Sequence, residues 1–201
     1  MSSGATIVLA DSDVLCSKAL REWLTLLHLT SSNSLFSVRW TDDIMGDVVA
    51  HHRQAHPDWP EHQVNRLRLK LEKTLADGRI TGYQVDSSLP HPASIRAHVH
   101  AAAVHGRVDM VVSTSGSEMP ELDELTYEIY HPDDLLLLID DAWPELVRDV
   151  TVEQLLYFHA RSSPSSVIDL PGRLRKAGAP GFAERVRCHL QNVDPSILSN
   201  R

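Results

Sequence analysis

The sequence is poor in cysteine and in aromatic residues, and it has no long hydrophobic run. Its 201 residues include two cysteines, Cys16 and Cys188, which lie far apart and belong to no CxxC or metal-ligand pattern. We therefore expect reduced thiols. No stretch approaches the roughly 18 consecutive apolar residues of a membrane span, and residues 1–10 lack the basic and apolar regions of a signal peptide. These absences predict a cytoplasmic protein with no membrane partner.

Basic charge is also scarce, because the net charge is −8. This balance argues against a protein that coats nucleic acid nonspecifically. The charges are unevenly distributed along the chain. Residues 118–153 hold twelve acidic side chains and one basic one, whereas residues 161–187 hold six basic and two acidic ones. The basic segment could contact phosphate, although a solvated helix face is the simpler interpretation.

Short β-prone segments alternate with longer segments of helical periodicity. Leu20, Trp23, Leu24 and Leu27 fall on one face of a helix, which follows an apolar strand at residues 7–10. A chain that is 42% hydrophobic can bury a full core. Alternating strands and helices predict the α/β class, as a three-layer sandwich around a central, mainly parallel sheet. The further strands are expected at residues 36–40, 109–112 and 127–130, and further helices at 42–52, 59–76, 95–105 and 131–142.

The C-terminal part of the chain reads as helical. A break is expected at Trp143-Pro144, Thr151 to Gln154 resemble a capping box for one tail helix, and Pro180-Gly181 introduces another. Gly78 stands where a helix C-terminal cap is favoured. We predict one domain over residues 1–142 and a helical extension over residues 143–201 that packs on or near it.

Acidic and hydroxyl side chains follow two of the predicted strands. Asp11 and Asp13 come directly after residues 7–10, and a loop from Ser113 to Glu118 follows residues 109–112. Parallel strands end at the same edge of a sheet, so these side chains should converge there. Clustered carboxylates suit Mg²⁺ or Mn²⁺. An Asp-x-Asp after a strand is also a common helix N-cap, so the motif alone leaves both roles open.

Several segments together resemble a known family. Residues 9–15 (LADSDVL) match a strand that ends in Asp-x-Asn before a long helix, with Asp13 in place of Asn. Residues 40–47 (WTDDIMGD) match a second signature, in which Asp47 occupies the position of a catalytic glutamate. The chain resembles the PIN-domain proteins of bacterial toxin–antitoxin pairs, from Ile7 to about Leu190. The resemblance predicts a PIN-like sandwich.

The resemblance continues in two later segments, one of which departs from the family pattern. His98, Val99 and the alanines at 101–103 match a small-residue helix, but Arg96 stands where the family places a catalytic aspartate. Residues 112–120 (VSTSGSEMP) match the fourth segment and keep Ser113 and Glu118. A cation at position 96 disfavours a second divalent ion.

The resemblance implies a metal-dependent endoribonuclease. Asp11, Asp47 and Glu118 would hold Mg²⁺ or Mn²⁺, whose bound water attacks the phosphodiester while Asp13 or Ser113 orients it. It implies RNA as substrate and an antitoxin protein as partner, and such proteins are often homodimers.

The alternative is a catalytically inactive PIN-like module. In this interpretation the side chain at position 96 pairs with Asp11 or Asp47, and the module binds RNA or an antitoxin without cleaving.

A haloacid-dehalogenase-like phosphatase is a third hypothesis. Asp11 and Asp13 also fit its opening acid pair, residues 110–113 fit its strand ending in serine, and Asp140-Asp141 fit its last acid pair. Between Ser113 and Asp140, however, there is no lysine or arginine to hold a phosphoryl group.

Two groups of histidines invite a zinc interpretation, His51-His52-His56 and His98-His100-His105. His52 and His56 are four residues apart on a predicted helix, but no third ligand is patterned around them. We expect exposed or capping roles for these histidines. His98 is expected to hold the start of its helix near the site.

Overall fold

The computed structural model describes residues 5–32, 35–86, 91–115, 125–161 and 168–194. Its centre is a parallel sheet with strand order β2-β1-β3-β4. The strands are β1 (Thr6–Ala10), β2 (Phe36–Arg39), β3 (Met110–Val112) and β4 (Glu128–Tyr130). Val8 pairs with Val38 on one side and with Met110 on the other. The predicted α/β class with a parallel sheet is confirmed.

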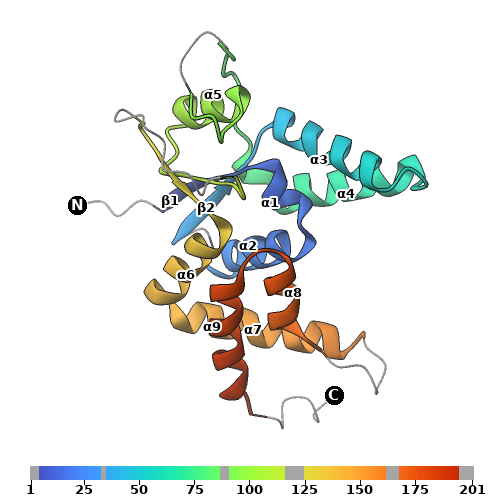
Figure 1. Ribbon diagram of the computed structural model, residues 1–201, viewed down its shortest axis with the longest axis vertical. Helices are drawn as coiled ribbons and strands as arrows, with labels where there is room; N and C mark the ends of the chain where they lie inside the picture. Colours follow the sequence, from blue (N-terminus) through green and yellow to red (C-terminus); the bar gives the residue numbers. More distant parts are fainter. Residues whose placement is uncertain (1–4, 33–34, 87–90, 116–124, 162–167, 195–201) are drawn as a thin grey trace.

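Helices cover both faces of this sheet, in an arrangement compatible with three layers. Figure 1 shows α5 (Ala97–His105) on one side and α2 (Lys18–Thr30) on the other. The predicted apolar face of α2 is buried, and its Trp23 is 3% exposed. Within the described ranges, no helix is both long and apolar enough to cross a membrane.

The connection between β1 and α2 contains a short helix that the sequence analysis did not predict. The carboxylate of Asp11 accepts a hydrogen bond from the backbone N–H of Ser12 and begins α1 (Ser12–Cys16). The next helix starts two residues after α1 ends. Asp11 therefore has the N-cap role that an Asp-x-Asp motif commonly plays, and it also lies at the carboxyl end of β1.

Helices α3 (Asp42–Ala55) and α4 (Glu61–Thr74) form a hairpin that projects from the sheet (Figure 1). Thr41 caps α3 by accepting a hydrogen bond from the backbone N–H of Ile44. The prediction that Gly78 is the C-terminal cap of the helix at residues 59–76 is wrong, because α4 ends at Thr74 with Leu75 as its C-cap, and a 3-10 turn, η1 (Ala76–Gly78), comes next. Gly78 instead lies directly against the backbone of β2.

The C-terminal helices are α6 (Pro132–Ala142), α7 (Pro144–His159), α8 (Leu170–Lys176) and α9 (Pro180–Gln191). The predicted break at Trp143-Pro144 is confirmed. The predicted capping box is wrong, because Thr151 is buried inside α7 and its hydroxyl donates to the carbonyl of Val147. The long apolar face of α7 continues through this position, so no helix begins there.

One hydrophobic cluster joins the C-terminal helices to the sheet. Val147, Leu174 and Phe182 belong to the same buried cluster as Leu9 of β1. The rings of Phe182 and Trp23 pack in a T-shaped arrangement at a centroid distance of 5.1 Å. The division at residue 142 stays a prediction.

Candidate functional site

The carboxyl ends of β1 and β3 bring the predicted acidic and hydroxyl residues together. The Asp13 carboxylate accepts hydrogen bonds from the hydroxyl of Ser113 at 2.9 Å and from the backbone N–H of Thr114 at 2.8 Å. The Thr114 hydroxyl also donates to it. Asp11 is joined to the same edge because its backbone N–H donates to the carbonyl of Val112 at 3.0 Å. The polar residues that directly follow β1 and β3 thus lie together at the carboxyl edge of the sheet.

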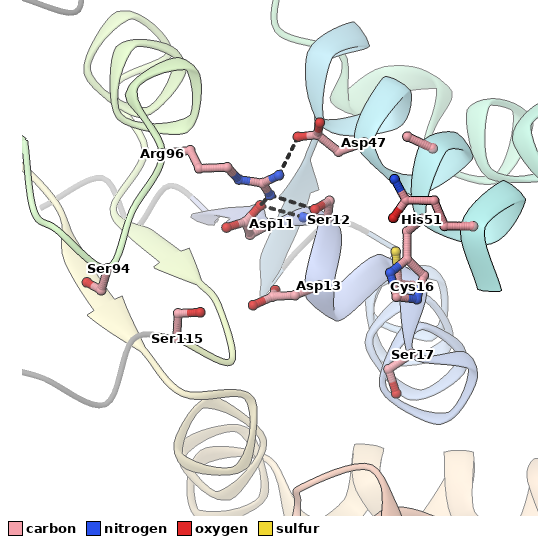
Figure 2. Close-up of a pocket in the computed structure, with 12 residues that line it drawn as sticks. Asp11, Ser12, Asp13, Cys16, Ser17, Asp47, His51, Ser94, Arg96 and Ser115 are labelled. Atoms are coloured by element: carbon pink, nitrogen blue, oxygen red, sulfur yellow. Dashed lines mark hydrogen bonds and ion pairs between the residues drawn. The ribbon is translucent and has the colours of Figure 1, made fainter.

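Arg96 lies between Asp11 and Asp47, two of the predicted metal ligands, as Figure 2 shows. Its Nη1 atom donates to Oδ2 of Asp47 at 2.6 Å. Its Nη2 atom donates to Oδ1 of Asp11 and, at 2.6 Å, to the hydroxyl of Ser12. One guanidinium therefore connects α3, α1 and the start of α5, where Arg96 is the N-cap residue.

The start of α5 places a second side chain beside Asp47. Nε2 of His98 lies 3.1 Å from Oδ2 of Asp47, within ion-pair distance but without hydrogen-bond geometry. The His98 side chain is largely buried. The role of His98 in holding the helix start near the site stays a prediction.

Burial and neighbouring charge act in opposite directions on Asp11. Burial and the adjacent Asp13 carboxylate raise the pKa of Asp11 above its usual 3.8, while Arg96 and the backbone N–H of Ser12 lower it. Burial also raises the pKa of the nearby Cys16 thiol to about 11. A thiol with so high a pKa is protonated at neutral pH and is a poor nucleophile.

These residues line an open pocket of about 620 Å³. Among the described residues that line it, the acidic side chains are Asp11, Asp13 and Asp47, and Arg96 supplies a positive charge. Sequence reasoning did not single out the other lining residues, several of which come from α3 and from the loop before α5. These are Ser12, Cys16, Ser17, Ala50, His51, Gln54, Ser94 and Ser115.

The described residues of the pocket do not fit a divalent cation as they are arranged. Asp11 and Asp47, two of the three predicted metal ligands, both direct an oxygen at the Arg96 guanidinium. A divalent cation between them would meet that positive charge. Across the described ranges, no group of three or more His, Cys, Asp or Glu side chains is placed to hold a metal. Glu118, the third predicted ligand, lies outside the described residues.

The histidines of α3 lie in two different environments, one buried and one exposed. The expectation that His52 is exposed or capping is wrong, because only 9% of it is exposed and neither ring nitrogen has a hydrogen-bond partner among the described residues. Burial lowers the pKa of His52 below 6.5. Its ring lies parallel to that of Trp59, with a centroid distance of 5.7 Å. His56 is exposed and occupies the C-cap of α3.

Asp140, the residue that the phosphatase hypothesis would place in the site, has a different environment. It is buried on α6 and its Oδ1 lies 2.6 Å from Nε2 of His189 on α9. Neither Asp140 nor Asp141 lines the pocket around Asp11. This placement counts against the phosphatase.

Comparisons with known proteins do not assign this chain to a family. No protein-family model matches this chain, and no curated protein or solved structure matches it.

Proposed function

We propose that this chain is a PIN-like module that holds RNA without cleaving it, and that the guanidinium of Arg96 takes the place of the divalent cation. The observation that carries the proposal is the position of Arg96 between Asp11 and Asp47. In the family that the sequence resembles, an aspartate at this position would add a third carboxylate. Here the side chain neutralises the two acids instead.

The energetics of Asp11 favour a stable guanidinium in this position. The Asp11 side chain is only 5% exposed, and an ionised carboxylate that is buried without a cation is costly. Arg96 contributes two charge-assisted hydrogen bonds to carboxylates and a third to Ser12. Without Arg96, the buried Asp11 carboxylate would have no cation beside it. A divalent metal that displaced Arg96 would therefore have to supply the same stabilisation.

RNA as the ligand rests on the PIN resemblance and is consistent with the pocket. The Arg96 side chain is 44% exposed, so part of its guanidinium faces the open pocket and can donate to a phosphate oxygen. Serine hydroxyls around the pocket offer further donors. An antitoxin protein and a homodimeric state are further expectations of the same resemblance.

A metal-dependent ribonuclease is the second candidate, and the exposure of Arg96 is the observation that favours it. A side chain that is 44% exposed can rotate into solvent, which would leave Asp11 and Asp47 facing the pocket. Mg²⁺ or Mn²⁺ is the cofactor that this candidate requires.

Calorimetric titration with Mn²⁺ separates the two candidates. We expect no Mn²⁺ binding to the wild-type protein, binding to Arg96→Asp, and loss of that binding in Arg96→Asp/Asp11→Asn. The control is Arg148→Asp, which makes the same charge change on an exposed arginine of α7. A wild-type protein that binds Mn²⁺ through Asp11, and then cuts a labelled RNA, would establish the ribonuclease and reject the proposal.

A further inference from the structure

A second charged surface lies on α4, outside the pocket. His62, Arg66, Leu69, Lys70 and Lys73 are all exposed, and their spacing places them on one face of the helix. We call these five residues the basic stripe of α4. They line a shallow open depression together with Asn65, and they share no residue with the pocket around Arg96. Figure 1 shows α4 on the projecting hairpin, away from the C-terminal helices.

The cations of the basic stripe have no partner in the part of the chain that the structure describes. The side chains of Arg66, Lys70 and Lys73 form no ion pair or hydrogen bond there. The acids of α4 are engaged elsewhere, since Glu61 pairs with Arg53 at 2.6 Å and Glu72 pairs with Arg68 at 2.7 Å. The stripe therefore keeps its positive charge in a protein whose net charge is −8.

The geometry of the stripe points to a linear polyanion. At ~1.5 Å of rise per residue, successive cations along the helix are separated by ~4.5 to 6 Å in the axial direction. A nucleic-acid strand carries its negative charges at a comparable, regular spacing along its length. A row of unpaired cations on one straight element can therefore neutralise several consecutive phosphates.

An acidic protein segment is the competing occupant, and the stripe is poorly suited to it. Stable protein interfaces bury on the order of 1,000 Å² or more around an apolar centre. The stripe offers one apolar side chain, Leu69, which is 64% exposed and is surrounded by cations. Attraction at this surface is thus mainly electrostatic, as in contacts to a phosphate backbone.

We infer that the basic stripe of α4 binds the phosphate backbone of single-stranded RNA, at a surface separate from the pocket. This inference rests on the proposed RNA-binding function. Contacts to phosphate carry no sequence information, so the stripe supplies affinity and orientation while other surfaces read the bases. Binding at the stripe falls steeply with salt, because each neutralised phosphate releases counterions.

The test measures binding of the full chain to a fluorescein-labelled 12-nucleotide RNA by anisotropy over a range of salt concentrations. The variant is Arg66→Gln/Lys70→Gln, and the matched control is Arg107→Gln/Arg148→Gln, which removes two exposed cations, one just after α5 and one on α7. We expect the stripe variant to bind ~10-fold more weakly at low salt, with a log–log salt slope reduced by ~1.4, since each single-strand phosphate contact contributes ~0.7. The control should bind as the wild type does.

Three results would overturn the inference, and they have different consequences for the proposed function. RNA binding that is unchanged in the stripe variant removes the stripe from the interface and leaves the RNA-binding module intact. Equal losses in variant and control show a general charge effect. A wild-type protein that binds no RNA rejects both proposals.

An acidic peptide tests the competing occupant directly. A labelled 12-residue poly-glutamate peptide that binds more tightly than the RNA, and loses its binding in Arg66→Gln/Lys70→Gln, would assign the stripe to a protein partner. Weaker binding of this peptide than of the RNA supports the nucleic-acid assignment.

Discussion

Nη1 of Arg96 lies 2.6 Å from Oδ2 of Asp47, so the N-cap residue of α5 is hydrogen-bonded to the middle of α3. The same guanidinium reaches Asp11 at the end of β1. Three elements that are distant in sequence are therefore held together by one side chain. Arg96 therefore has both an electrostatic and a structural effect on this part of the molecule.

Replacement of Arg96 by glutamine should lower the free energy of unfolding at neutral pH. The Asp11 carboxylate, 5% exposed, would lose its cation, and we expect a cost of ~1–2 kcal/mol, below the cost of breaking a fully buried pair because Arg96 is 44% exposed. Urea unfolding followed by circular dichroism measures the change. Arg148→Gln, which breaks an exposed pair with Glu145, is the control and should cost less than ~0.5 kcal/mol.

The loss in Arg96→Gln should depend on pH through Asp11. Because the pKa of Asp11 in the folded protein is raised above 3.8, its carboxylate takes up a proton on acidification before the unfolded chain does. Once the Asp11 carboxyl is neutral, burial of this group without a neighbouring cation no longer carries the cost of an unpaired charge. The difference between variant and wild type should therefore shrink as the pH falls through that pKa. A difference that stays constant down to pH 3.8 would contradict this assignment.

His52→Phe should stabilise the protein, most clearly at acidic pH. Both ring nitrogens of His52 are buried and have no hydrogen-bond partner in the described part of the chain, and burial lowers the pKa of His52 below 6.5. The unfolded chain then binds the proton more readily, so the stability associated with neutral His52 is present above pH 6.5 and is lost as the pH falls through the folded pKa. Phenylalanine removes the two unpartnered nitrogens and this titration, and we expect a gain of ~1 kcal/mol.

The matched control for His52→Phe is His159→Phe, which changes an exposed histidine at the end of α7. Denaturant unfolding on either side of pH 6.5 should show a stabilised, flatter pH profile only for the substitution at position 52. A profile that is equally steep in wild type and His52→Phe would show that another group controls the acid sensitivity.

Asp133 should stabilise the attachment of the last helix. Its two carboxylate oxygens accept hydrogen bonds from the backbone N–H groups of Gly181 at 2.9 Å and Phe182 at 2.7 Å, at the start of α9. Asp133→Ala would leave both donors without this partner, and we expect a loss of ~1–2 kcal/mol in urea unfolding. Asp134→Ala, an exposed acid on the same turn of α6, should change stability by less than ~0.5 kcal/mol. Comparable losses in the two variants would refute the capping role.

Local sequence patterns predicted the elements whose periodicity is strong. The apolar run of β1 and the four-residue apolar face of α2 are buried as expected. The sequence analysis also proposed that Arg96 pairs with Asp11 or Asp47, and the structure places its guanidinium against both. These features follow from burial of apolar stripes and from the common edge of parallel strands.

Features that depend on tertiary packing were not predicted. Thr151 resembles a cap in sequence, yet the apolar face of α7 continues past it and the helix does not break. His52 looks like a surface residue until α3 packs against its neighbours and buries it. Likewise Ser94 and Gln54 join the pocket only because the loop before α5 and the third helix face each other there. No local rule connects such positions.

Gly78 and Gly46 should respond in opposite directions to substitution by alanine. A Cβ atom at Gly78 would lie 2.2 Å from the backbone carbonyl oxygen of Val38, so β2 or η1 would have to shift. The backbone N–H of Trp40 donates to the carbonyl of Gly78 at 3.0 Å, and this contact would be strained by the shift. We expect Gly78→Ala to cost ~2 kcal/mol or more. Gly46 lies inside α3, and apart from the local helix backbone no atom of the described residues lies within 4 Å of the position that a Cβ atom would take there. There alanine should stabilise the helix by ~0.5–1 kcal/mol. Thermal unfolding of the two variants beside the wild type measures both signs, and a neutral Gly78→Ala would mean that the turn and β2 are not in close contact in solution.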